Sequence, residues 1–231
     1  MIKDQHTNEV SIHHIAEIYL YEYYISNDNY TIIDEDKLIR VLNEGDTYQE
    51  KKSFDKAFDK YMDALKLNPV SSDIFRKVIK CLRESKQFDE MKKMTVKSYD
   101  FCCTRNEMAS FYRNLGFYYL ETYKPDLAGA LYRYSDFFAE SETAANEIKY
   151  LETAMKKNYS NLSISDIQAS LDENNIPKAA NPVTLALLVK AGEEALSKNN
   201  RIQALDCYKM VYDLSYDNEI KEIIDKIQME G

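Results

Sequence analysis

The sequence predicts an all-α fold, an α-α superhelix in which antiparallel helix pairs stack into a solenoid. Glycine and proline are scarce, with 5 and 4 residues among 231, which disfavours folds rich in tight β turns and suits helices joined by short connections. Apolar residues recur at three- and four-residue steps, the spacing of one buried helical face. Small and aromatic residues also return together in several segments, which indicates a helical repeat.

Composition narrows the class of protein. With 45% hydrophobic and 30% charged residues, the chain is expected to fold, and its net charge of -9 disfavours broad binding to nucleic acid or anionic membranes. No window approaches the roughly 20 apolar residues that span a bilayer, and Met1 begins a polar stretch, so we expect a cytoplasmic protein. The four cysteines lack C-x-x-C spacing and are expected to be free, buried thiols: Cys81, Cys102, Cys103 and Cys207.

The first repeat is expected near Val41 to Pro69. Lys52 to Pro69 predicts its second helix, in which Ala57 and Ala64 are small so that another helix can approach closely. The rest of the buried face consists of larger residues: Phe54, Phe58, Tyr61, Leu65 and Leu67. Pro69 follows Asn68 at the expected helix end, and Val41 to Tyr48, with Gly45, supplies the first helix.

The segment Tyr112 to Phe138 carries both helices of a second clear copy. Its small residues, Gly116 and Ala128, are expected to let the two helices pack closely, while bulky side chains fill the surrounding space. The signature positions are Tyr112, Leu115, Gly116, Tyr119, Ala128, Tyr132 and Ser135. In this pattern the chain resembles the tetratricopeptide repeat family, over roughly Leu38 to Leu214 with one break, and we expect a bacterial member.

Two further copies are weaker. In Phe75 to Tyr99, Ile79 and Thr95 replace a usual small residue and a usual aromatic, so looser or altered packing is expected there. In Leu188 to Leu214 the pattern returns, and Asn181-Pro182 is expected to be the N-cap and first residue of its first helix.

Four regions follow from these assignments. Residues 1–29 hold an N-terminal helix that packs on the array and covers the first repeat, although its Tyr and Ile content also suits a strand. Asn27 to Asn29 are expected to form a turn. Residues 30–157 hold repeats and a following helix, and residues 182–231 hold the last repeat and a capping helix. Between them, residues 158–181 interrupt the array, as an irregular repeat, a hinge or a pocket-forming insertion.

The resemblance implies a noncatalytic scaffold that binds a peptide segment of a protein partner in the concave groove lined by the first helix of each repeat. On that face the sequence offers a basic set that suits acidic peptides: Arg76, Lys80, Arg83, Arg113, Asn114 and Phe117. Charge reversal at Lys80 and Arg113 is expected to weaken such binding without unfolding the protein. A solvated basic face is the alternative interpretation. Leu42 and Asp46 stand where chaperone-binding members have a lysine and an asparagine, which disfavours chaperone tails.

Other functions have less support in the sequence than the scaffold. Motifs for phosphate loops, dinucleotide binding, serine hydrolases and zinc proteases are missing, and the only histidines are His6, His13 and His14, so we expect no enzyme, metal or cofactor. A ligand-responsive regulator whose residues 158–181 move is the second hypothesis, and self-association through the N-terminal helix is the third. Tyr118, Tyr123, Tyr134 and Tyr216 are not required by the repeat and are candidates to line a surface.

Overall fold

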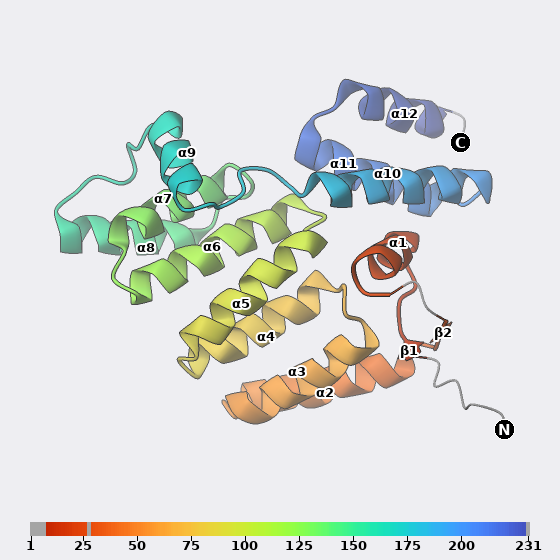
Figure 1. The fold of residues 1–231 in the computed structure, drawn as a ribbon, viewed down its shortest axis with the longest axis horizontal. Helices are drawn as coiled ribbons and strands as arrows, with labels where there is room; N and C mark the ends of the chain where they lie inside the picture. Colours follow the sequence, from red (N-terminus) through yellow and green to blue (C-terminus); the bar gives the residue numbers. More distant parts are fainter. Residues whose placement is uncertain (1–7, 27–28, 230–231) are drawn as a thin grey trace.

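The computed structural model describes residues 8–26 and 29–229, and its backbone is predominantly helical (Figure 1). Three consecutive antiparallel helix pairs form the first part of the array: α2 (Asp36–Glu50) with α3 (Phe54–Leu67), α4 (Ser72–Glu84) with α5 (Phe88–Ser98), and α6 (Arg105–Glu121) with α7 (Pro125–Asp136). Each helix packs on the next along the chain. The predicted all-α superhelix is therefore confirmed, and the chain has a tetratricopeptide-like repeat fold.

Within the repeats, a glycine of the first helix lies opposite a tyrosine of the second, whereas the sequence predicted only small residues with bulky side chains around them. A Cβ atom added to Gly45 would lie 2.5 Å from Cε1 of Tyr61, and one added to Gly192 would lie 3.0 Å from the ring of Tyr208. In α6 the ring of Tyr132 lies 3.4 Å from the corresponding point on Gly116. At Gly45 and Gly192 the missing side chain therefore makes room for a buried ring, whereas Gly116 leaves space for a methyl group.

The second pair reverses this size relation. Ile79 on α4 and Thr95 on α5 occupy the positions of the glycine and the tyrosine, and both are buried, at 3% and 0% exposure. The Thr95 hydroxyl donates to the carbonyl of Met91 in its own helix, at 2.8 Å. At this pair the large residue therefore lies on the first helix and the small one on the second, and both are buried.

The array becomes irregular after α7. Helices α8 (Glu142–Met155) and α9 (Ile164–Glu173) both pack on α7, and the buried ring of Tyr159 fills the space above Gly129. Residues 174–181 then run along a row of tyrosines: the hydroxyls of Tyr112, Tyr134 and Tyr99 donate to the carbonyls of residues 177, 178 and 179, at 2.9, 2.6 and 2.8 Å. Tertiary contacts thus fix the course of this connection.

The last repeat consists of α10 (Pro182–Ser197) and α11 (Arg201–Ser215), followed by α12 (Asn218–Met229), which packs on α11. Asn181 accepts a hydrogen bond from the backbone N–H of Val183 and Pro182 is the first helical residue, so the predicted helix start is confirmed.

The N-terminal region differs from the expectation. Helix α1 (Ile15–Tyr24) joins two short strands, β1 (Asn8–Val10) and β2 (Tyr30–Ile32), which pair in parallel. The sequence did not predict this ladder, because three-residue strands carry too little pattern to recognise. Residues 27 and 28 of the expected turn lie outside the described residues.

Helix α1 packs mainly on α10, far along the chain, which corrects the expectation that it covers the first repeat. The Tyr24 hydroxyl lies 2.9 Å from Oγ1 of Thr184, and Tyr19 donates to Glu194. Contact with the first repeat is made at its edge, where Asn68 Nδ2 donates to Glu17 at 2.8 Å.

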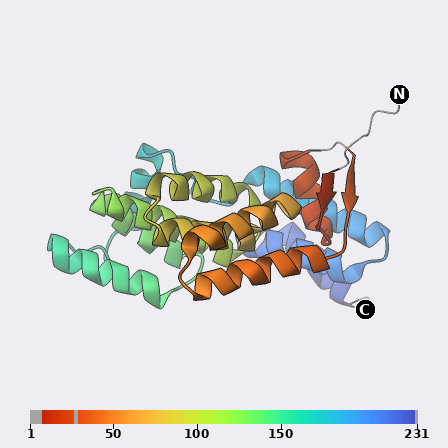
Figure 2. The ribbon, with the colours of Figure 1, turned by 90° about the horizontal axis from the view of Figure 1, so that it is seen from below.

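The core therefore consists of two hydrophobic clusters. One joins α1 and the first two helix pairs to α10–α12, and the other fills the space between α6, α7, α8 and α9. Helices α1 and α12 lie at one end of the molecule and α8 and α9 at the other (Figures 1 and 2). Between these ends, the first helices of successive repeats form the walls of the candidate site.

Candidate functional site

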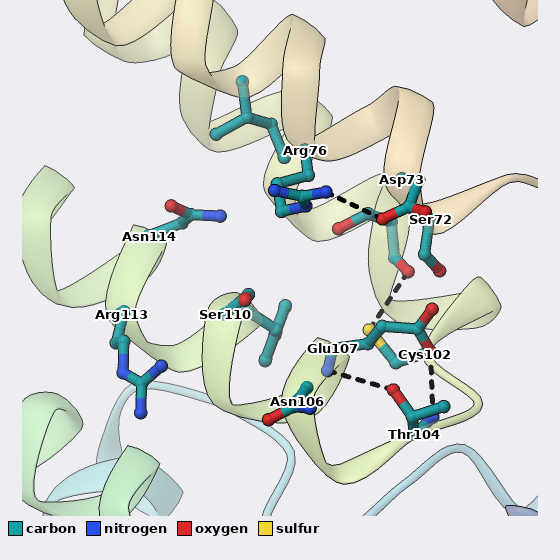
Figure 3. Close-up of a pocket in the computed structure, with 13 residues that line it drawn as sticks. Ser72, Asp73, Arg76, Cys102, Thr104, Asn106, Glu107, Ser110, Arg113 and Asn114 are labelled. Atoms are coloured by element: carbon teal, nitrogen blue, oxygen red, sulfur yellow. Dashed lines mark hydrogen bonds and ion pairs between the residues drawn. The ribbon is translucent and has the colours of Figure 1, made fainter. Parts of the chain in front are cut away.

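The largest cavity near the predicted contacts is formed by α4, α6 and the start of α8, with a volume of about 780 Å³. All six residues predicted for the groove line it: Arg76, Lys80, Arg83, Arg113, Asn114 and Phe117. A smaller cavity of about 380 Å³ adjoins it, between the N-terminal halves of α4 and α6 (Figure 3). The structure thus brings together side chains from two helices that belong to different repeats.

Helix α4 supplies a basic wall. Arg76, Lys80 and Arg83 lie at steps of four and three residues, so they share one face of the helix. Arg76 pairs with Asp73 at 2.9 Å, in contact with solvent, and Arg83 lies 5.3 Å from the ring centre of Phe117. Lys80 is exposed and makes no ion pair within the described part of the chain. Its ammonium group is therefore available to a partner, as is that of exposed Lys86, which also lines the cavity.

Arg113 has a different role from the one predicted. Its guanidinium donates to the carbonyl of Ala139 and to Oγ of Ser135, which lies 3.3 Å from Nε. In Figure 3 the side chain points away from Arg76. Burial lowers its pKa below the usual value. Arg113 therefore fastens the turn between α7 and α8, and these contacts argue against the expectation that its charge can be reversed without harm to the fold.

Aromatic and aliphatic side chains form the floor of the cavity. The rings of Phe117 and Phe88 meet edge to face, with centres 5.9 Å apart. Ile79 and Tyr132 complete this floor, and Asn114 points toward Arg76 (Figure 3). An apolar side chain flanked by charged groups would fit such a surface.

Two acidic residues on the far side of the cavity were missed by sequence reasoning. Glu121 ends α6 and Glu147 lies on α8. Burial raises the pKa of Glu147, nearby Glu121 raises it further, and Arg83 opposes the shift. The sequence predicted an amphipathic helix here, but only the packing of α8 on α7 shows that Glu147 faces the cavity.

The polar groups of the smaller cavity are used by the backbone. Glu107 accepts from the N–H groups of Cys103 and Thr104 at 2.7 and 2.8 Å, and the Thr104 hydroxyl accepts from the Glu107 N–H at 3.3 Å. This reciprocal capping box starts α6. Over residues 8–26 and 29–229, no group of three or more His, Cys, Asp or Glu side chains is placed to hold a metal ion.

Asp46, at a position where chaperone-binding members of the family have an asparagine, is held by two neighbouring side chains. Asp46 accepts from the Tyr61 hydroxyl at 2.6 Å and pairs with Lys77. Burial raises the pKa of Asp46, but the hydrogen bonds from Lys77 and Tyr61 outweigh it, so the net shift is downward. A stable carboxylate at this place repels an incoming carboxylate.

Of the four tyrosines considered for a ligand surface, only Tyr134 and Tyr216 share a cavity, of about 310 Å³. Tyr134 is buried and bound to the carbonyl of Lys178, whereas Tyr123 is 93% exposed in the turn between α6 and α7. Tyr216 accepts from Arg105 at 2.7 Å near the end of α11, and Tyr118 lies under the ammonium of Lys92. They form no common stacking surface.

The predicted state of the cysteines is confirmed, since all four are free and buried. Burial is the main cause that raises their thiol pKa values, to about 11 for Cys81 and about 12 for Cys207. Cys102 lines the smaller cavity, but burial raises its pKa too, so its thiol is not activated as a thiolate. Nucleophilic chemistry is therefore not supported by these groups.

The described helices include none with the length and apolar character that crossing a bilayer demands. Helix α1, considered as a self-association surface, buries its apolar side against α10. Ile15, Ala16, Leu20 and Tyr21 are all buried within the chain. The exposed apolar face on which that hypothesis depended is thus covered over these four residues.

No model of a known protein family matches the sequence, and no curated protein matches it either. Solved structures similar to the chain include the first tetratricopeptide domain of Spaghetti (RPAP3) bound to an HSP90 peptide, at 17% identity over 54% of this chain and 98% of that one, with a TM-score of 0.47. The TPR2AB domain of yeast Sti1 matches at 12% identity over 78% of this chain and 64% of that one, with a TM-score of 0.48.

The protein YrrB, described as a TPR protein with an unusual peptide-binding site, matches at 17% identity over 83% of this chain and 94% of its own, with a TM-score of 0.44. All three TM-scores lie below 0.5. The helix pairing and the glycine–tyrosine contacts described above are what establish the repeat fold of this chain.

Proposed function

We propose that this protein is a protein-interaction scaffold that binds a segment of a partner in the cavity between α4, α6 and α8. The observation that carries the proposal is the basic wall of α4, which stands beside an apolar floor in a chain of net charge -9. A cavity of about 780 Å³ accommodates a few side chains of a peptide.

The chemistry of the wall favours an acidic residue in the partner. The Lys80 ammonium is exposed, and the exposed Arg76–Asp73 pair stabilises the fold little, so both cations can turn toward a carboxylate. Charge-assisted hydrogen bonds to a carboxylate are stronger than neutral ones. Arg113 lines the cavity but spends its donors on Ser135 and the carbonyl of Ala139.

A charge reversal at Lys80 tests the proposal, with Lys149→Glu as a matched control. Lys149 is exposed on α8 and does not line the cavity, so both variants change the net charge equally. Partners are captured from a lysate on wild type and both variants and then titrated by calorimetry. Loss of one charge-assisted bond, worth about 1.5 kcal/mol, is expected to weaken binding roughly tenfold for Lys80→Glu.

The control is expected to bind the same partner as wild type does. A partner that binds Lys80→Glu and wild type with equal affinity would refute the assignment of this cavity. Circular dichroism of all three proteins checks that helix content is unchanged, as the exposed position of Lys80 leads us to expect.

A further inference from the structure

We infer that the partner segment carries an acidic residue and a basic residue three positions apart, with apolar side chains between them. This inference rests on the proposed function, because it describes the segment bound in the same cavity. It is drawn from the charges on opposite sides of the cavity, which differ in net sign.

Charge is distributed unevenly around the cavity. Arg76 and Lys80 stand on the α4 side, near Asn114 of α6, whereas Glu121 and Glu147 stand beyond Phe117 toward α8. Arg83 lies against the ring of Phe117 and pairs with Glu84, and Lys86 also lines the cavity. A bound segment therefore meets the cations Arg76 and Lys80 on one side, and on the other side a mixed group in which carboxylates outnumber cations.

The carboxylates of Glu121 and Glu147, which line the cavity, lack an ion-pair partner within the described residues. Burial raises the pKa of Glu147, Arg83 opposes that shift, and nearby Glu121 adds to it. A cation from the partner would offset the effects of burial and of Glu121, whereas a third carboxylate would increase them.

The length of the cavity along α6 sets the spacing of the two charges in the segment. Asn114 and Glu121 are two helical turns apart on α6, which corresponds to about 10 Å at 1.5 Å per residue. An extended chain advances about 3.3 Å per residue, so an acidic and a basic residue three positions apart span the same distance. The apolar side chains between them then lie over Phe117 and Phe88.

Labelled, capped peptides that differ only in charge test whether the segment needs a basic residue. The reference peptide is Gly-Gly-Asp-Leu-Phe-Lys-Gly-Gly, and its two relatives carry Gln or Asp in place of Lys. Fluorescence polarisation is expected to rank the affinities Lys over Gln over Asp, with about a tenfold range. In Glu147→Gln, the Lys peptide should lose about fivefold in affinity and the Asp peptide should gain.

Controls separate the inference from the proposed function. Glu222→Gln, an exposed carboxylate on α12, should leave all three affinities unchanged. Glu121→Gln provides a second test of the acidic side if Glu147→Gln is poorly folded. Equal or tighter binding of the Asp peptide to wild type, with dependence on Lys80 retained, would overturn the inference alone. Binding of all three peptides that ignores Lys80, or no binding at all, would overturn both.

Discussion

Gly129 on α7 offers the sharpest test of how this fold packs. The glycine faces Tyr159, whose ring is completely buried, and an added Cβ would lie 2.8 Å from Cγ and 2.9 Å from Cε1 of that ring. Because Cγ is close to the backbone, the ring cannot swing aside unless residues 158–160 move. Those residues are held by Glu152, which accepts from the N–H groups of Tyr159 and Ser160 at 2.9 and 2.8 Å.

Two opposing terms set the effect of Gly129→Ala on the free energy of unfolding. Alanine is favoured over glycine inside a helix by about 1 kcal/mol. Overpacking costs about 1–3 kcal/mol, and displacement of Tyr159 from its 2.8 Å bond to Asp126 costs about 1 kcal/mol more. We therefore expect a net loss of about 1–3 kcal/mol, or a melting midpoint lower by about 3–10 °C in a chain of this size.

Gly116→Ala is the matched control, since it lies inside α6 but leaves ordinary van der Waals contact, 3.4 Å to the ring of Tyr132. Here the propensity gain should dominate, and the midpoint should stay equal or rise by about 1–3 °C. Thermal unfolding followed by far-ultraviolet circular dichroism measures both. If Gly129→Ala were as stable as Gly116→Ala, the tight contact between α7 and Tyr159 would be refuted.

Three further predictions concern a polar bridge, an ion pair and the buried thiols. Thr184→Val should lower the free energy of unfolding by about 1–3 kcal/mol and speed hydrogen exchange in α1, because Thr184 bonds both the Tyr24 hydroxyl and the Asp100 carbonyl. Exposed Thr153→Val should change neither quantity, and equal exchange in the two variants would contradict a bridge through Thr184. Hydrogen bonds from Lys157 and Tyr159 lower the pKa of Asp126, so the stability that its charge contributes should be complete above pH 3.8, the ordinary pKa, and lost as the pH falls through the lower folded pKa. The melting midpoint of Asp126→Asn should therefore differ from that of wild type near neutral pH and converge with it in acid. A difference that stays constant with pH would argue against the ion pair. The four thiols should react with a disulfide reagent only as fast as the chain unfolds, and prompt reaction of any one of them in the native protein would show that it is not buried.

The repeat helices and the basic side of the cavity were accessible from the sequence because they depend on local spacing. Arg76, Lys80 and Arg83 share a face for any helix that contains them, and the spacing of Gly116 and Tyr132 within one repeat is enough to predict their small-to-large pairing. The acidic side was not accessible in this way. Glu147 is one of several carboxylates on an amphipathic helix, and only the packing of α8 turns it toward Arg83.

By itself, the sequence determined the helical class, the presence of the repeats, the start of α10 at Pro182 and the absence of a recognisable catalytic motif, because each follows from residues that are near one another in the chain. Only the tertiary structure decided that α1 packs on α10, that three tyrosine hydroxyls hold residues 177–179, and that the guanidinium of Arg113 binds the turn between α7 and α8. These are contacts over large sequence separations or choices among several polar partners, and local pattern carries no information about which partner is met.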